Sequence, residues 1–192
     1  SIDIKKFNQH MEYVTDNYEI THINNVGSSE INISITIDDG YKDTLNAVDV
    51  LTKKNIPFTL YISPGNLDKT HYLSSKDVKD ISLLNECIIG THGYSHRKLS
   101  TLDKIQQKAE LQKSKIVLED LIGKEINTLS YPHGSFNQQT ISIAKELGYV
   151  SAASSIKGFN NIKTHPFKMR RIEVIASDKL KELSKKIKGY YD

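Results

Sequence analysis

Short apolar segments alternate with amphipathic segments along most of the chain, and this alternation restricts the possible folds more than any other feature. The predicted strands cover residues 31–37, 57–63, 86–90, 127–131, 149–155 and 169–175, with a further short strand at 18–23. The predicted helices cover residues 3–16, 44–54, 74–84, 100–123, 137–148 and 177–187. Such alternation predicts βα units around a parallel sheet, either as a barrel or as an open doubly wound sheet.

Four of the predicted helices have a polar residue at the start that is suited to capping, and two end at a glycine. The expected N-terminal caps are Ser74, Ser100, Asn137 and Ser177, and the expected terminal glycines are Gly123 and Gly148. There is no Gly-x-Gly-x-x-Gly or P-loop motif, which counts against the nucleotide-binding forms of this architecture.

Length and composition are those of an ordinary globular protein. A chain of 192 residues suits one domain, residues 1–192, with the helix at 3–16 packed on the sheet. The net charge of +3 is too small and too dispersed to indicate a nucleic-acid partner. No apolar run approaches the roughly 18 residues of a membrane span, so we expect no transmembrane segment.

Cys87 is the only cysteine, which excludes an intrachain disulfide and a cysteine-based zinc site. No signal peptide is visible, but a chain that begins at Ser1 without a methionine is expected to be processed or trimmed. The missing signal peptide therefore says little about export. We expect a protein that is exported or associated with the cell envelope, with a cytoplasmic location as the alternative.

Two polar clusters follow predicted strands. The isoleucines of residues 31–37 alternate with polar residues, and the strand stops at Asp38-Asp39-Gly40. The strand at 86–90 leads to His92 and His96. Taken alone, the first cluster could be a plain turn and the second a pair of surface histidines.

Together, one carboxylate and two imidazoles are a suitable ligand set for a divalent metal ion with open positions. The four-residue spacing predicts both rings on one side of a single helical turn.

Thr-Ile-Asp-Asp-Gly at 36–40 and His-x-x-x-His at 92–96 resemble the first two motifs of the polysaccharide deacetylases. These are the NodB-homology domains of carbohydrate esterase family four. Ile37 stands where the family usually has Phe, and Gly93 where it has Ser or Thr. The resemblance covers residues 7–187. It implies an α/β fold, namely a distorted, incomplete (β/α) barrel of six or seven parallel strands.

The resemblance also implies the roles of the two clusters. Asp39, His92 and His96 would bind a divalent metal ion, Zn²⁺ or alternatively Co²⁺. Asp38 would then be the general base that takes a proton from metal-activated water. Adjacent carboxylates suit this division, because the cation keeps one ionised while its neighbour can accept a proton.

Leu-Ser-Tyr-Pro-His-Gly at 129–134 resembles the third family motif, with Ser130 in place of the arginine that usually orients the base. A branch that acts on poly-N-acetylglucosamine shares this change and tends to have an Arg-Ile pair near the end, as at Arg171-Ile172. Arg171, in preference to Arg170, is therefore expected to supply the missing charge, although both would lie at the start of a strand. The alternative is a surface arginine at a strand edge.

The backbone N–H of His133 is the expected oxyanion donor by its position in the motif. The family's fourth-motif Asp and fifth-motif Leu-x-His are not visible, so His133 and His165 are both candidates for the general acid. Substrate contacts are expected at residues beside the motifs, where tyrosine rings could stack on sugars or simply pack in the core. These residues are Tyr41, Tyr94, Tyr131 and Pro132.

The function expected from the sequence is metal-dependent removal of N-acetyl groups from N-acetylglucosamine-containing polysaccharide. The alternatives within the same fold are an O-acetyl esterase of the acetylxylan type and an imide or ureide hydrolase. A further alternative is a catalytically silent carbohydrate-binding domain.

Overall fold

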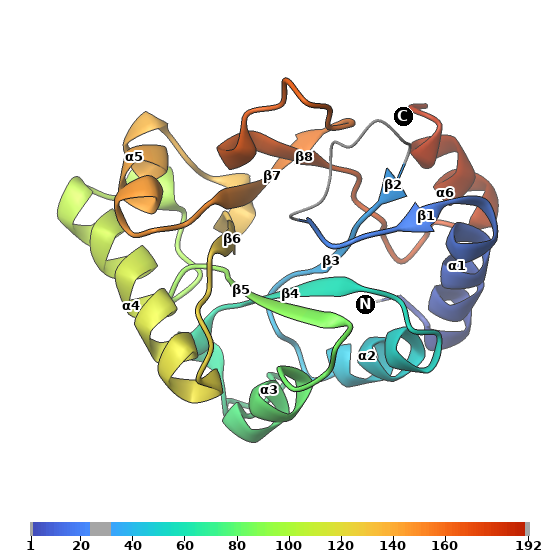
Figure 1. Ribbon diagram of the computed structural model, residues 1–192, viewed down its shortest axis with the longest axis horizontal. Helices are drawn as coiled ribbons and strands as arrows, with labels where there is room; N and C mark the ends of the chain where they lie inside the picture. Colours follow the sequence, from blue (N-terminus) through green and yellow to red (C-terminus); the bar gives the residue numbers. More distant parts are fainter. Residues whose placement is uncertain (1, 24–31, 191–192) are drawn as a thin grey trace.

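A computed structural model describes residues 2–23 and 32–190. Six parallel strands form one curled sheet in the order β3-β4-β5-β6-β7-β8, which gives an incomplete barrel whose edges are β3 and β8 (Figure 1). The strands are β3 (Ile35–Ile37), β4 (Phe58–Ile62), β5 (Cys87–Thr91), β6 (Thr128–Ser130), β7 (Ser151–Lys157) and β8 (Met169–Arg171). The expected α/β barrel is therefore confirmed, with six strands in the sheet.

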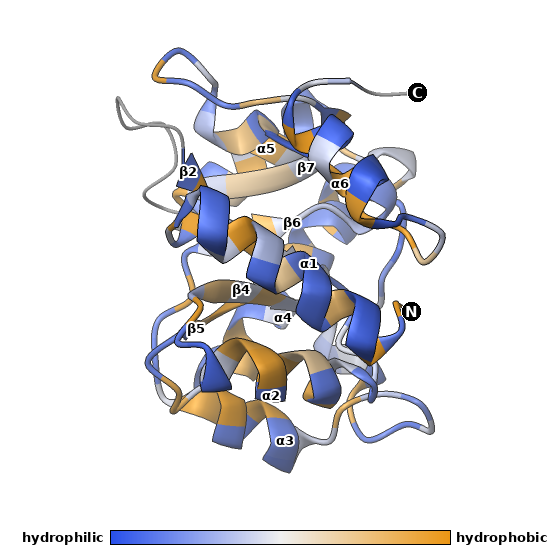
Figure 2. Cartoon of the chain, turned by 90° about the vertical axis from the view of Figure 1, so that its right-hand side faces the viewer, coloured by the Kyte–Doolittle hydropathy of each residue, from blue (hydrophilic) through white to orange (hydrophobic). Residues whose placement is uncertain are grey.

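Helices surround this sheet on its outer side, as Figure 1 shows. They are α1 (Ile4–Asn17), α2 (Thr44–Lys53), α3 (Ser75–Ile81), α4 (Lys104–Ile122), α5 (Gln138–Glu146) and α6 (Leu180–Ile187). Helix α1 presents a largely hydrophilic outer face (Figure 2) and buries Met11 and Val14. No helix within residues 2–23 and 32–190 is both long enough and apolar enough to cross a membrane.

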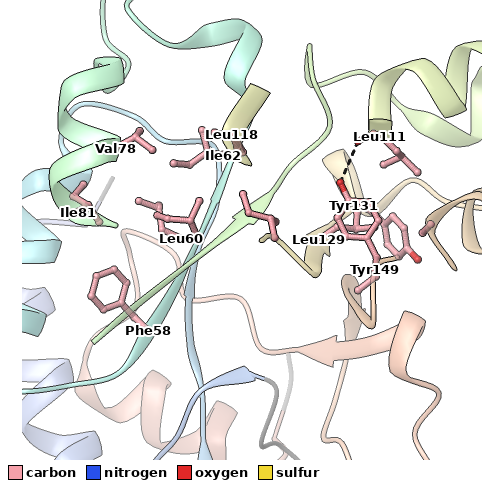
Figure 3. Packing of buried hydrophobic residues seen from close by; sticks show 14 of the residues in the cluster. Phe58, Leu60, Ile62, Val78, Ile81, Leu111, Leu118, Leu129, Tyr131 and Tyr149 are labelled. Carbon is pink, nitrogen blue, oxygen red and sulfur yellow. Dashed lines mark hydrogen bonds between the residues drawn. The ribbon is translucent and has the colours of Figure 1, made fainter. Parts of the chain in front are cut away.

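The core lies between the sheet and the helices. All five residues of β4 are buried, as expected for a central parallel strand that is covered on both faces. Leu60 and Ile62 of this strand lie close to Val78 of α3 and Leu118 of α4 (Figure 3). This packing holds the carboxyl ends of the strands in fixed positions.

The predicted strand at 31–37 is divided in two. Residues 32–33 form β2 (Asn32–Ile33), which pairs with β1 (Glu19–Ile20) in a separate two-stranded parallel sheet. Only Ile35–Ile37 joins the main sheet as β3, next to β4. Residue 31 and the predicted loop at 24–30 lie outside the described residues.

Local capping signals identified some helix ends correctly. Ser74 and Asn137 cap α3 and α5, and Gly123 ends α4 in the left-handed conformation with φ 68°. Ser100 was the wrong cap for α4, because the carboxylate of Asp103 accepts the N–H of Gln106 at 2.8 Å and begins the helix.

Two predicted elements near the C-terminus are shorter than expected. Helix α6 begins at Leu180, so Ser177 does not cap it; instead the carboxylate of Glu182 accepts the N–H of Lys179. Strand β8 stops at Arg171 and does not continue to residue 175. Arg171 thus lies at the carboxyl end of its strand, and the prediction that it lies at the start was wrong.

Candidate active site

The carboxyl ends of four strands bring the candidate residues together at one end of the barrel. Asp38 and Asp39 follow β3, and His92 follows β5. Ser130 ends β6, and Arg171 ends β8. Parallel barrels place their functional groups at this end, where the strands have their carboxyl ends.

Asp39, His92 and His96 form a cluster that could hold a metal ion. One ligand atom from each lies within 4.8 Å of the others. Asp39 Oδ1 is 3.3 Å from His92 Nε2 and 3.0 Å from His96 Nε2. Within the described part of the chain, this is the group of three or more histidine, cysteine, aspartate or glutamate side chains whose ligand atoms lie close enough together to hold a metal ion.

The surroundings of His92 fit a metal ligand. Its side chain is 3% exposed, and its Nδ1 lies 2.8 Å from the carbonyl oxygen of Ser130. With a metal ion bound, the neutral ring would carry its proton on Nδ1, which donates to this carbonyl, and the lone pair of Nε2 would be available to the ion. A carboxylate oxygen and two imidazole nitrogens converging in this way suit zinc or a similar divalent ion.

The backbone of the site is held in an unusual conformation. Asp39, His96 and His133 all have positive φ, at 76°, 61° and 57°. Left-handed backbone is uncommon outside glycine and is concentrated at functional sites. Residues 92–96 do not form a helical turn, so the prediction based on their spacing was wrong. The two rings instead approach to 4.9 Å between centroids through a loop that turns at Gly93.

Asp38 is held apart from the cluster by an arginine. Arg171 Nη1 and Nη2 each donate to a different oxygen of the Asp38 carboxylate, both at 2.8 Å. The hydroxyl of Ser130 donates to Asp38 Oδ2 at 3.1 Å. Asp38 Oδ2 remains 4.0 Å from His92 Nε2. One carboxylate thus contacts the histidines, and its neighbour contacts a guanidinium.

These contacts keep both carboxylates ionised. Burial raises the pKa of Asp38, but the charge and hydrogen bonds of Arg171, with smaller contributions from His92 and Ser130, bring it below its usual value. Hydrogen bonds with His92 and His96 lower the pKa of Asp39 despite its partial burial. Asp38 is therefore available as a proton acceptor at neutral pH.

The guanidinium of Arg171 is fixed by further contacts that sequence reasoning did not identify. Its Nε donates to the carbonyl of Ser154 at 2.9 Å, and Nη1 donates to the hydroxyl of Thr36 at 3.3 Å. The neighbouring Arg170 is exposed and donates to the carbonyl of Lys157 at 3.3 Å. Of the two arginines, it is thus Arg171 that reaches Asp38.

The two candidate acids lie in different places. The ring of His133 is 4.4 Å from that of His96 between centroids, and its side chain is exposed. His165 lies before β8, where its Nδ1 accepts the N–H of Phe167 at 3.1 Å. Its neighbours Thr164 and Pro166 line a cavity at the opposite end of the barrel, beside the start of β7. The structure therefore does not bring His165 to the site.

Burial separates the residues that were expected to contact substrate. Tyr131 is fully buried, stacks on Phe136 and donates its hydroxyl to the carbonyl of Phe167 at 3.0 Å, and Pro132 is buried too. Both belong to the packing, which corrects their expected contact with sugar. The half-buried ring of Tyr94 already has the Lys113 ammonium 3.9 Å from its centroid.

Tyr41 is 44% exposed and stacks on Tyr72, with 4.9 Å between centroids. Tyr41 follows Asp39 by two residues, and hydrogen bonding with Tyr72 and the charge of Asp39 raise the pKa of the Tyr41 hydroxyl. Sequence reasoning missed Tyr72, because its only signal was an aromatic residue in a loop 31 positions after Tyr41.

Comparison with known proteins gives a family match and several relatives of the same fold. A family model described as polysaccharide deacetylase matches residues 25–152, which include both aspartates and both histidines of the site. The polysaccharide deacetylase candidate YxkH of Bacillus subtilis (strain 168) is 26% identical over 180 residues, 88% of this chain. The chain spans 64% of the length of YxkH, which is less than two thirds.

Solved structures agree with the fold. The Streptococcus pyogenes deacetylase PplD, solved in complex with acetate, has a TM-score of 0.87 at 20% identity, covering 97% of this chain and 87% of that chain. A de-N-acetylase from Aggregatibacter actinomycetemcomitans has a TM-score of 0.78 at 14% identity, covering 95% of this chain and 87% of that chain. The family model covers more than half of the 192 residues, and this chain therefore belongs to the polysaccharide deacetylase family.

Proposed function

We propose that this chain is a metal-dependent hydrolase that removes N-acetyl groups from N-acetylglucosamine-containing polysaccharide. The observation that carries the proposal is that two adjacent carboxylates have different partners. Asp39 contacts two histidines that could bind a metal ion, while Asp38 is held by Arg171 only 4.0 Å from one of them.

Asp39, His92 and His96 would hold the metal ion through Oδ1 and the two Nε2 atoms. A bound divalent ion would polarise the acetyl carbonyl and make water more acidic at this position. Zinc is the ion that this ligand set suits best, with cobalt as the alternative.

Asp38 acts as the general base. Its carboxylate is kept ionised and oriented by the two hydrogen bonds from Arg171, so that it can accept a proton from the attacking water. The backbone N–H of His133 is the proposed donor to the developing oxyanion. The His133 imidazole, next to His96, is the proposed acid for the leaving amine.

The substrate assignment rests on the aromatic surface and on the family. Tyr41, stacked on Tyr72, presents an exposed ring beside the site on which a sugar could lie. Ser130 with Arg171 resembles the arrangement of the poly-N-acetylglucosamine branch. A solved relative of the same fold is described as a de-N-acetylase. A protein that acts on such a polymer would be exported or associated with the cell envelope.

The test is acetate release from a panel of substrates by the zinc-loaded protein. N-Acetylglucosamine oligomers are expected to be turned over faster than the monomer, acetylated xylan or a cyclic imide. Faster release from xylan would assign an O-acetyl esterase, and turnover of the imide would assign a ring-opening amidase. No reaction with any of them, with zinc bound, would favour a silent carbohydrate-binding domain.

A further inference from the structure

A buried carboxylate on helix α4 contacts the loop that carries the two histidines. Glu110 is 8% exposed. Its Oε2 accepts the backbone N–H groups of Tyr94 at 3.0 Å and Ser95 at 2.9 Å, and its Oε1 accepts the Ser95 hydroxyl at 2.5 Å. All three donors lie between His92 and His96. A buried carboxylate is costly unless it is hydrogen-bonded, so these contacts account for its presence in this position.

A second residue of α4 contacts the same loop. Ser114 follows Glu110 by four residues, which places both on one face of the helix. Ser114 is fully buried, and its hydroxyl donates to the carbonyl of Gly93 at 3.0 Å. Helix α4 therefore contacts three consecutive residues, 93–95, through side chains that are not part of the proposed metal site.

The loop needs such support, because its conformation is not one that its residues would prefer. His96 has φ 61°, a left-handed backbone conformation that is unfavourable for a residue with a Cβ. Gly93 has φ 65°, and a Cβ there would lie 3.1 Å from Pro132 Cγ and 3.6 Å from Glu110 Oε2. The loop thus passes through a narrow space between Pro132 and Glu110.

We propose that Glu110 is a positioning residue that, with Ser114, holds the 93–95 loop so that His92 and His96 converge on Asp39. The inference rests on the proposed metal site. Nitrogen ligands must lie about 2.0–2.1 Å from a zinc ion, so a small displacement of the loop would weaken binding. The neighbouring residue Ser95 gives Glu110 its most direct influence over His96.

Two substitutions separate positioning from charge. In Glu110→Gln the amide oxygen can accept both backbone N–H groups, while the amide NH₂ can donate to the Ser95 hydroxyl. In Glu110→Leu the volume is similar, but all three donors lose their acceptor. Zinc affinity, measured by competition with a chromophoric chelator, is expected to fall roughly 10–100-fold in Glu110→Leu. Glu110→Gln is expected to bind zinc nearly as tightly as wild type.

Glu119→Leu is the matched control. Glu119 lies on the same helix, and its carboxylate also accepts a partly buried backbone N–H, that of Ile126 at 2.8 Å. It lies far along α4 from the histidine loop, so its loss is expected to affect stability but not zinc affinity. Thermal unfolding followed by circular dichroism identifies a temperature at which all variants are folded.

Each outcome decides between interpretations. Wild-type zinc affinity in Glu110→Leu would overturn the proposal, and so would equal weakening in Glu110→Gln, since that result would assign the effect to charge. If Glu110→Leu does not fold, Ser114→Ala replaces it and is expected to weaken zinc binding. Unchanged zinc affinity in Ser114→Ala would then overturn the proposal that α4 positions the 93–95 loop. Zinc binding by wild type that does not depend on Asp39 would instead contradict the proposed function.

Discussion

At the scale of single residues, the site depends on two neighbouring aspartates that have different partners. The backbone turns at Asp39 and Gly40, with φ 76° and 75°, and this turn directs the two carboxylates to different groups. Asp39 faces the histidines, whereas both oxygens of Asp38 accept from Arg171. The same residue type can therefore serve as ligand and as base.

Substitution of Asp38 by asparagine is expected to abolish the base without removing the metal ligands. Asp38→Asn keeps the size of the side chain but cannot accept the proton, so turnover should fall roughly 10²–10⁴-fold. Acetate release and zinc content are measured on the same samples. Activity within a few-fold of wild type, at equal zinc content, would show that Asp38 is not the base.

Arg171 and Arg170 form a matched pair, since only Arg171 of the two contacts Asp38. Arg171→Met removes charge-assisted hydrogen bonds worth about 1.5–3 kcal/mol, which corresponds to roughly 10–100-fold in rate if they act in the transition state. Arg170→Met is expected to have little effect on the rate constant for acetate release. Equal rate constants for acetate release in the two variants would show that Arg171 has only a structural role.

At the scale of elements, the sequence predicted the order and type of the main strands and helices better than their ends. Alternation and apolar spacing are local properties, and they located β4, β5 and α4 to within a few residues. Strand ends depend on pairing with neighbours, which explains why the strand at 169–175 was predicted too long. The loop conformation at 92–96 depends on contacts with α4, which the four-residue spacing could not reveal.

The packing of α1 against the C-terminal segment contains a buried histidine. His10 is 2% exposed, and its Nε2 has no hydrogen-bond partner among the residues that the structure describes. Burial and the charge of Lys6 lower the pKa of His10, although Asp178 opposes this shift. The neutral ring is therefore the form that the fold accommodates.

This burial makes stability depend on pH in a stated direction. The unfolded chain, with a histidine pKa of about 6.5, takes up the proton more readily than the folded chain. Wild type should therefore lose stability as pH falls below about 6.5, until the lower folded pKa is passed. Urea unfolding of the metal-free protein at pH 7.5 and 5.5 measures the loss.

His10→Gln cannot titrate at this position and is expected to lose less stability than wild type over the same interval. Other histidines are common to both proteins, so the comparison isolates His10. An equal loss in the two proteins would mean that His10 does not carry this dependence.

At the scale of the whole molecule, the sheet is an incomplete barrel whose two edge strands meet through side chains. Arg171 ends β8 and binds Asp38 at the end of β3, so the ion pair links the edges of the sheet. The Asp-Asp-Gly turn and the histidines could be found from the sequence because they follow recognisable strands. The position of Arg171 was inferred from family resemblance, since nothing local indicates a contact between residues 133 positions apart.

The remaining parts of the site arise only from the folded structure. Ser130 was visible as a departure from the family motif, but its hydrogen bonds to Asp38 and Arg171 were not. Tyr131 appeared equally suited to the core or to a sugar, and its burial against Phe136 assigns it to the core. Such outcomes depend on which face of a strand is covered, and this is a property of the whole fold.

The most direct test of the account is a zinc titration of chelator-treated protein, with acetate release from N-acetylglucosamine oligomers and bound zinc measured together. We expect activity to rise from near zero and to saturate at one zinc ion per chain. His96→Ala, which removes a ligand whose side chain is 27% exposed, is expected to bind little zinc and release little acetate. Full activity without zinc, or zinc content in His96→Ala equal to that of wild type, would contradict the account.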